Sequence, residues 1–183
     1  MADIKQAIIR IIHQNECNTL APSSSSKLTY QVGVDDQTSQ LYIRISENSG
    51  GGFFSNEWVS LEKIQSIIAK QPAKQSFRSL VFKEAFVSRG ANNSGFLGAA
   101  LRGLGIVDAV PKSPFSHTAG DMSKFTKSMQ ALIKDGTSLP DLIAQRAEAL
   151  EKKRKEQMET LRKVREAKAK ETSKSNISAK QTK

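Results

Sequence analysis

The segment Lys27–Ser46 reads KLTYQVGVDDQTSQLYIRIS. Apolar residues occupy every second position on both sides of the sequence Asp35–Thr38, which is rich in turn-forming residues. Such alternation places one side of each strand against a core and the other toward solvent, as in an antiparallel sheet. The segment therefore predicts a β-hairpin with strands near residues 28–34 and 41–45.

Further elements extend outward from this hairpin. A third strand is expected over Phe53–Val59, after the glycine-rich loop Asn48–Gly52. Helices are expected where apolar residues recur every three to four positions. They cover residues 2–15, 60–70, 74–88, 95–104 and 123–134. Ser138 and Pro140 suit the start of another, long helix that runs to about residue 171.

These elements together predict an α+β fold. We expect a small antiparallel sheet of about three strands, packed with four or five helices and followed by a long, solvent-exposed C-terminal helix. Residues 1–110 are expected to form a compact α+β domain, and residues 111–137 a linker with a short helix. The long charged helix is expected over 138–171, and a disordered tail over 172–183.

Positive charge is unevenly distributed along the chain, whose formal net charge is +10. Residues 1–70 carry six Lys/Arg and seven Asp/Glu, and are nearly neutral. Residues 71–120 carry six against two, and residues 121–183 carry 16 against nine. Clustered positive charge is typical of proteins that bind nucleic acid. The charge therefore favours a polyanionic partner, contacted by the second half of the chain.

The C-terminal helix has three interpretations. Its glutamates and lysines recur four residues apart in the order that stabilises a helix, as at Glu151–Lys155. Phosphates would be attracted by its cations Lys152, Lys153, Arg154, Lys155, Arg162, Lys163 and Arg165. A solvated spacer helix has the same pattern. A coiled coil is the third interpretation, because Ile143, Leu150 and Val164 fall at multiples of seven, although Gln157 interrupts the row.

Two predicted helices meet at a short turn around Gly90, and this arrangement resembles a helix-turn-helix in outline. On this interpretation Asn92 and Asn93 open the recognition helix, and asparagine reads adenine. The accompanying cations are Arg78, Lys83, Arg89, Arg102 and Lys112. The alternative is a helical hairpin packed on the sheet. Glycines in GFLGAALRGLG, residues 95–105, favour this alternative because they allow another backbone to approach closely.

Aromatic residues around the glycine-rich loop suggest another surface. Tyr42 shares a strand face with Arg44, and Phe53 and Trp58 follow the loop. Aromatic rings interleaved with cations on an open sheet stack unpaired bases. Strands followed by an amphipathic helix over Leu28–Lys70 resemble, in outline, the positive-cofactor-like single-strand-binding domains. This resemblance implies a single-stranded ligand, whereas the alternative is that these aromatic residues belong to the core.

Groups suited to catalysis or metal binding are sparse. His13 and His117 lie far apart in the sequence, and the pair His13 and Cys17 lacks a third ligand. Asp35-Asp36 is explained by a hairpin turn, and Gly50–Gly52 lacks the Lys-Ser/Thr of a phosphate-binding loop. We therefore expect no enzyme activity, no cofactor and no metal.

The sequence also bears on location and partners. The only cysteine is Cys17, and neither a signal-peptide pattern nor a long apolar segment is present, so a cytoplasmic location without membrane association is expected. The leading hypothesis is a nucleic-acid-binding accessory or regulatory protein, with DNA and RNA both open. The alternative is a protein-interaction, scaffold or assembly factor that docks through its C-terminal helix. Oligomeric state is open.

Overall fold

A computed structural model describes residues 8–178 of the chain, with side chains up to Glu166. The chain forms two units, Met1–Pro140 and Asp141–Lys183. The described part of the second unit is dominated by one helix, α4 (Leu142–Ser178). All the remaining elements belong to the first unit.

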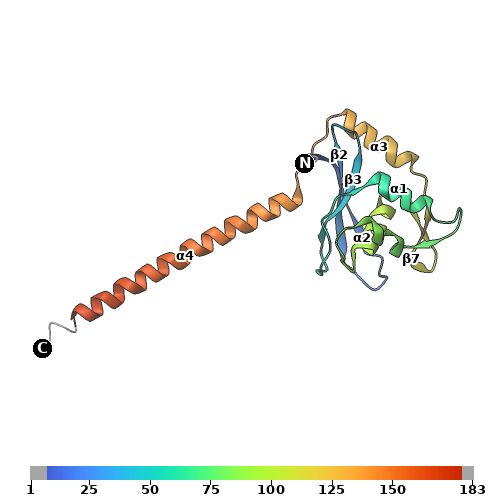
Figure 1. The fold of residues 1–183 in the computed structure, drawn as a ribbon. Coiled ribbons are helices and arrows are strands. Elements are labelled where there is room, and N and C mark those ends of the chain that lie inside the picture. Colours follow the sequence, from blue (N-terminus) through green and yellow to red (C-terminus); the bar gives the residue numbers. More distant parts are fainter. Residues whose placement is uncertain (1–7, 179–183) are drawn as a thin grey trace, which may run out of the picture. The chain divides into compact units, whose positions relative to one another are not determined.

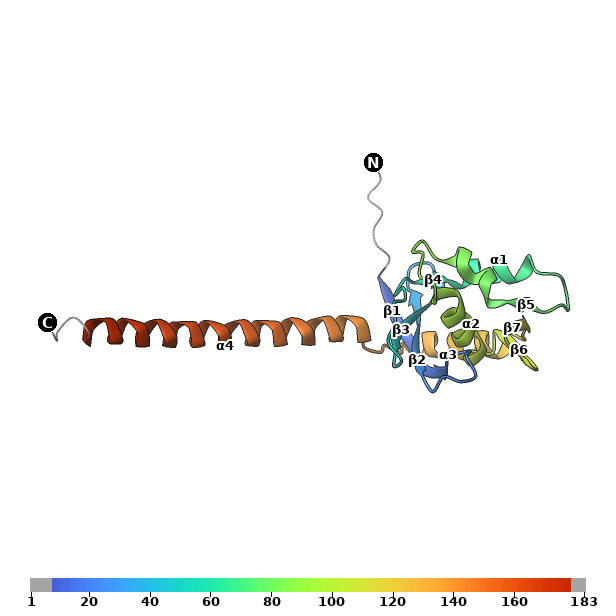
Figure 2. The same cartoon turned by 90° about the horizontal axis from the view of Figure 1, so that it is seen from below.

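Four antiparallel strands form the first sheet, in the order β1-β2-β3-β4. Figure 1 labels β2 and β3, and Figure 2 labels all four. They are β1 (Ile9–Asn18), β2 (Lys27–Asp35), β3 (Leu41–Asn48) and β4 (Val59–Ser60). The predicted hairpin is confirmed, because β2 pairs with β3 from Leu28 opposite Asn48 to Val34 opposite Leu41. The alternating apolar residues of β2 are buried as predicted, but the other side of the strand does not face solvent, because Thr29 and Gln31 are buried as well.

The helix predicted over residues 2–15 is wrong where the structure describes it, because Ile9–Asn18 is strand β1. Residues 2–7 lie outside the described part of the chain. A β-bulge between Ile11 and His13 shifts the register against β2, and the neighbours Ile11 and Ile12 are both buried. Adjacent buried residues imitate helical spacing, whereas isoleucine favours a strand once a partner strand is present.

A second antiparallel sheet corrects the expectation of a single sheet of about three strands. Its strands, in the order β5-β7-β6, are β5 (Phe77–Arg78), β6 (Val107–Val110) and β7 (Ser113–Ala119). The third strand predicted over Phe53–Val59 forms only at its end, where β4 begins. The protein is α+β overall, with one sheet of four strands and one of three.

The helix predicted over residues 74–88 is also wrong. This stretch contains β5 and a 3₁₀ helix, η1 (Ser79–Ala85). Phe77 joins the second sheet opposite His117, and the fully buried Phe82 meets the Phe77 ring edge-on, with centroids 6.0 Å apart. The broad apolar pattern therefore arises from aromatic side chains buried on several sides of a short, irregular segment.

Three α-helices pack on one face of the first sheet, and Figures 1 and 2 both show them on the same side of it. They are α1 (Leu61–Ala69), α2 (Asn93–Gly103) and α3 (Ser123–Lys134). The main core joins Val32 and Ile43 of the sheet to Ile64 of α1, Leu101 of α2 and Phe125 of α3. This core positions the start of α2 at the surface of the first unit.

Two segments have more secondary structure than the sequence predicted. Residues 111–137, expected as a linker with a short helix, contain β7 and α3, and Phe125 and Met129 of α3 are buried in the main core. In the tail predicted to be disordered, residues 172–178 continue α4. Residues 179–183 lie outside the described part of the chain.

Candidate nucleic-acid interface

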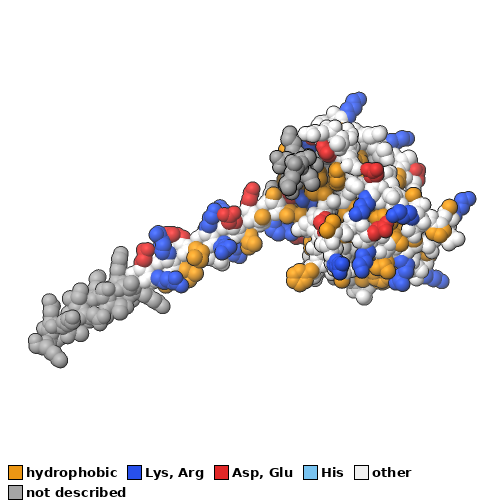
Figure 3. Space-filling model, viewed as in Figure 1, with side chains coloured by type: hydrophobic (Ala, Val, Ile, Leu, Met, Phe, Trp, Pro, Cys, Tyr) orange, Lys and Arg blue, Asp and Glu red, His pale blue; other side chains and the backbone are white. Residues whose placement is uncertain are grey.

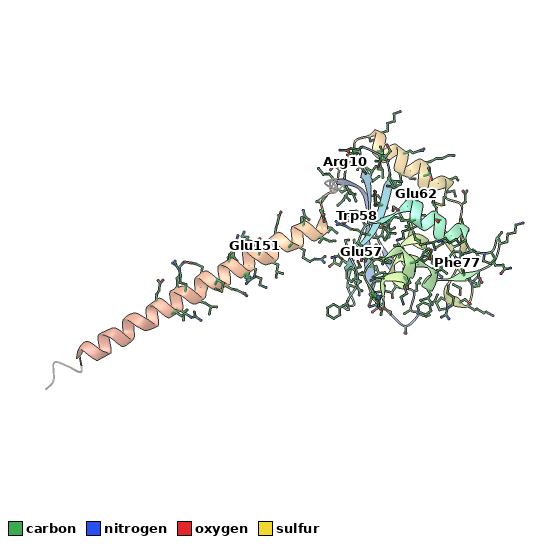
Figure 4. All side chains as sticks on the ribbon, in the orientation of Figure 1. Arg10, Glu57, Trp58, Glu62, Phe77 and Glu151 are labelled. Atoms are coloured by element: carbon green, nitrogen blue, oxygen red, sulfur yellow. The ribbon has the colours of Figure 1, made fainter. Side chains whose placement is uncertain are left out.

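The segment that leads into α2 is anchored by Glu57 (Figure 4). The carboxylate accepts hydrogen bonds from Val87 N at 2.8 Å and Ser88 N at 2.9 Å. Burial raises the pKa of Glu57, but these bonds and those from the Ser88 and Ser55 hydroxyls outweigh burial and lower the pKa to about 2. The ionised carboxylate therefore holds this segment in place at neutral pH.

The two asparagines at the start of α2 have different surroundings. Asn93 is 4% exposed, accepts a hydrogen bond from Ser55 N at 2.9 Å and donates to the Ser88 hydroxyl at 3.2 Å. Asn92 is exposed and donates from Nδ2 to Phe53 O at 3.1 Å. Asn93 therefore fixes the fold, and only Asn92 of the two predicted base-reading residues lies at the surface.

A pocket of about 460 Å³ lies at the start of α2. Its wall combines the loop after β1, the β5–η1 segment, the first turn of α2 and a residue of β7. Large apolar side chains in the wall are Leu20, Leu80, Phe96 and Phe115. Arg78 and Asn92 are polar residues of the same wall. The structure thus brings together two residues that the sequence singled out and that are 14 positions apart along the chain.

The chemistry of the pocket combines an apolar interior with positive potential. Phe115 is 42% exposed and Leu80 is 64% exposed, so part of the apolar wall faces solvent. Arg78 is exposed and supplies a guanidinium. The N–H groups of Ser94 and Gly95, in the first turn of α2, have no acceptor within the helix and carry partial positive charge. A flat apolar group attached to an anion fits this combination.

Ser79 also lines the pocket and belongs to a buried hydrogen-bond network with His117 and Arg102. Its hydroxyl lies 2.6 Å from His117 Nε2. Arg102 donates from Nε to His117 Nδ1 at 3.0 Å, and from Nη2 to the carbonyl of Ser116 at 2.6 Å. Because Nδ1 accepts a hydrogen bond, the imidazole proton sits on Nε2 and is donated to the serine.

This proton placement is the reverse of that in a nucleophilic serine, whose histidine must accept the hydroxyl proton. The Ser79 hydroxyl instead donates to Phe115 O at 3.2 Å. The partner on Nδ1 is the cation Arg102, where a catalytic triad has a carboxylate. Burial, and secondly the charge of Arg102, lower the pKa of His117 to about 4, which keeps the ring neutral. The network braces β7 against η1 and α2.

The other cations predicted in this region do not line the pocket. Arg102 is half-buried and committed to His117. Lys83 follows Phe82 in η1, and Arg89 lies in the segment before α2; both are exposed. Lys112 is exposed at the turn between β6 and β7, with a φ of 61°. Residues 97–101 of α2 are all buried, so this helix does not present the open face that a groove-reading helix needs.

The aromatic residues predicted to stack bases are dispersed. The guanidinium of Arg44 lies 4.2 Å from the ring centroid of Trp58, so this buried arginine covers one face of the indole. Tyr42 is half-buried and donates to Gln40 Oε1 at 2.7 Å. Phe53 is 96% exposed, and its carbonyl is held by Asn92 at the pocket wall. Of the three, Phe53 has the freest ring.

The predicted cations of α4 are all exposed, and several form ion pairs within the helix. Figure 3 shows Lys and Arg side chains interspersed with Asp and Glu along the described part of this helix. Lys155 pairs with Glu151 at 2.7 Å. Arg162 and Lys163 share Glu159, at 2.9 Å and 3.7 Å. Lys152, Lys153, Arg154 and Arg165 form no ion pair with another described side chain. Ion pairs within the helix therefore neutralise only part of the positive charge of α4.

Sequence reasoning missed the apolar wall of the pocket. Phe96 fell within the helix predicted over residues 95–104 but was not singled out, and Phe115 lay in a Pro- and Ser-rich stretch expected to be a linker. Neither residue stands out in the sequence, because the pocket forms only when β7, η1 and α2 come together.

Comparison with protein-family models, with curated proteins and with solved structures finds no match for this chain. Between residues 8 and 178, no helix is both long enough and apolar enough to cross a membrane. Among the described side chains, no group of three or more His, Cys, Asp or Glu residues could hold a metal ion.

Proposed function

We propose that this protein binds single-stranded DNA or RNA as an accessory or regulatory factor in the cytoplasm. An unpaired base enters the pocket at the start of α2, and its phosphate lies against Arg78. The observation that carries the proposal is the meeting of Arg78 with Phe96 and Phe115 in one pocket. Base stacking on aromatic side chains beside a cation is the common solution for binding single strands.

The size and charge of the pocket support a nucleotide unit in preference to a duplex. A pocket of about 460 Å³ is within the usual range for small-molecule sites. A duplex keeps its bases stacked inside, where a concave pocket does not reach them. Basic residues elsewhere, including the unpaired cations of α4, would add affinity without sequence preference.

The test is fluorescence anisotropy of labelled single-stranded and duplex oligonucleotides with the full chain across a salt series. Arg78→Gln is expected to weaken single-strand binding about tenfold, which corresponds to about 1.4 kcal/mol for one charged contact. Phe115→Ala is expected to cost about 1–3 kcal/mol of binding free energy through lost stacking.

Lys127→Gln is the matched control, because Lys127 is an exposed cation of α3 that does not line the pocket. It removes the same charge and should weaken binding by less than about twofold. Equal weakening by Arg78→Gln and Lys127→Gln would mean that bulk charge, and not the pocket, is responsible. Tighter binding of the duplex would also contradict the proposal.

A second candidate function is a protein-interaction factor that docks through α4. The specific observation in its favour is that Leu150, Met158, Leu161 and Val164 are between 47% and 68% exposed along this helix. Binding of phosphates would leave these apolar side chains exposed to water. The two functions are compatible, because they use different units of the chain.

A further inference from the structure

Four apolar side chains of α4 form a narrow surface that we name the α4 seam. It consists of Leu150, Met158, Leu161 and Val164, with exposed fractions of 68%, 63%, 53% and 47%. At 3.6 residues per turn, these four positions fall within an arc of about 120°. The seam has the width of a surface that packs against one other helix.

Three of the unpaired cations of α4 lie within this seam or at its edge. Arg154 and Arg165 lie within its arc and Lys153 lies at its edge, and none of these cations has an ion-pair partner among the described side chains. Arg154, Met158, Leu161 and Arg165 line one groove along the helix, and the ion-paired residues Glu151, Lys155, Glu159, Arg162 and Glu166 line the same groove. The seam is therefore both apolar and positively charged.

The acidic residues of α4 lie outside the seam. By the same helical geometry, Glu148, Glu156, Glu159 and Glu166 project from the remaining arc of the helix, and Glu151 lies just beyond one edge of the seam as Lys153 lies just beyond the other. Three of them are engaged there, with Lys155, Arg162 and Lys163. These ion pairs of α4 thus form outside the seam's arc, whereas Arg154 and Arg165 within that arc have no ion-pair partner among the described side chains.

The combination of apolar side chains and unpaired cations indicates what kind of partner the seam binds. A second copy of α4 would oppose cations with cations in either orientation. Phosphates would neutralise the cations but leave four apolar side chains in water. A membrane surface favours a wide apolar face with aromatic residues, and residues 142–178 contain no Phe, Tyr or Trp.

We propose that the α4 seam docks an acidic amphipathic helix of another protein. The partner helix carries apolar side chains every three to four residues, which cover the seam, and Asp or Glu beside them, which pair with Lys153, Arg154 and Arg165. This interaction belongs to α4 alone and does not rest on nucleic-acid binding by the first unit.

The test uses the full chain and a labelled synthetic peptide of about three heptads, with Leu at the a and d positions and Glu beside them. Anisotropy is expected to report saturable binding that weakens as salt rises. Leu161→Gln and Arg154→Glu should each weaken it at least about tenfold. Lys152→Glu is the matched control, because it reverses an unpaired cation that projects away from the seam, and should weaken binding less than about threefold.

Several outcomes would overturn the proposal. These are absence of peptide binding, equal weakening by Lys152→Glu and Arg154→Glu, and equal binding of a peptide with the same composition but scrambled leucine spacing. Self-association of the full chain that Leu161→Gln abolishes would assign the seam to a second copy. Binding to phosphatidylserine vesicles that Leu161→Gln abolishes would assign it to a membrane. Leu161 lies outside the pocket of the first unit. A Leu161→Gln variant that loses peptide binding but retains oligonucleotide binding would therefore test this proposal independently of the proposed function.

Discussion

At the residue scale, polar side chains whose structural role the sequence did not indicate organise the region around the pocket. Glu57 holds the segment before α2, and the pair of His117 and Arg102 braces β7 against α2. Gly98 makes this bracing possible, because a Cβ there would lie 2.9 Å from both His117 Nε2 and Ser79 Oγ. The sequence predicted close approach at these glycines, but of a backbone, whereas side chains approach Gly98.

Gly98→Ala is therefore expected to destabilise the protein. The added methyl must displace the buried network, at a cost of about 1–3 kcal/mol. Gly95→Ala is the matched control on the same helix, because a Cβ there meets nothing within 4 Å. It should stabilise the protein by up to about 1 kcal/mol through helix propensity. Urea denaturation measures both, and equal stability of the two variants would contradict the role assigned to Gly98.

Glu57→Gln tests the anchor of the segment before α2. The amide keeps one acceptor but places N–H₂ against a second donor, so stability at neutral pH should fall by about 1–3 kcal/mol. The folded pKa of Glu57, about 2, lies below the ordinary value of 4.5. Its stabilisation is therefore present above pH 4.5 and lost as pH falls toward 2.

The measurement for Glu57 is the free energy of unfolding of both proteins between neutral pH and pH 2. The difference between wild type and Glu57→Gln should shrink through the window from about 4.5 to 2. A difference that stays constant over this window would show that the carboxylate charge is not what anchors the segment.

At the element scale, a repeated local pattern predicted some elements correctly and misled at others, such as the ten-residue strand β1, whose isoleucines imitate helical spacing. The hairpin of β2 and β3 follows from strict alternation, and α3 was predicted with the bounds that it has, Ser123–Lys134. β5 has two residues, too few for any period to be detected, and its partner β7 lies far along the chain. β7 also contains Pro114, which suggested a loop.

The candidate site was predictable only in part. Arg78 and Asn92 were named from charge and helix-start chemistry, and both line the pocket. Arg102 and Asn93 were named for the same reasons, but their side chains are committed to internal hydrogen bonds. Composition indicates which residues are able to bind an anion. It does not indicate which of these side chains remain free of internal hydrogen bonds in the folded protein.

The segment after α3 belongs to the first unit, which truncation can test. Leu139 N donates to Ile11 O at 2.8 Å, Gln31 Nε2 donates to Pro140 O at 3.1 Å, and Arg10 donates to Thr137 O. A chain ending at Pro140 keeps these bonds and should unfold at nearly the same urea concentration as the full chain. A chain ending at Gly136 loses all three, and should be less stable by about 2–4 kcal/mol. Equal stability of the two truncations would contradict this boundary.

At the scale of the whole molecule, the two units differ in how densely they carry positive charge. Residues 1–140 carry 15 Lys/Arg and 11 Asp/Glu, whereas residues 141–183 carry 13 and seven in less than a third of the length. The overall net charge of +10 therefore says little about the pocket, whose proposed selectivity depends on Arg78 and its aromatic neighbours. On our proposals, the first unit recognises an unpaired base and α4 brings a partner protein to it.

The most direct measurement of the central proposal is photocrosslinking of the full chain to a short single-stranded oligonucleotide that carries one 5-iodouracil, followed by peptide mapping. Halogenated bases couple preferentially to nearby aromatic rings, so adducts on Phe115 or Phe96 are predicted, and Arg78→Gln should reduce their yield. Adducts confined to Tyr42 on the first sheet and Trp58 just before β4, or to α4, with none in the pocket, would contradict the proposed interface.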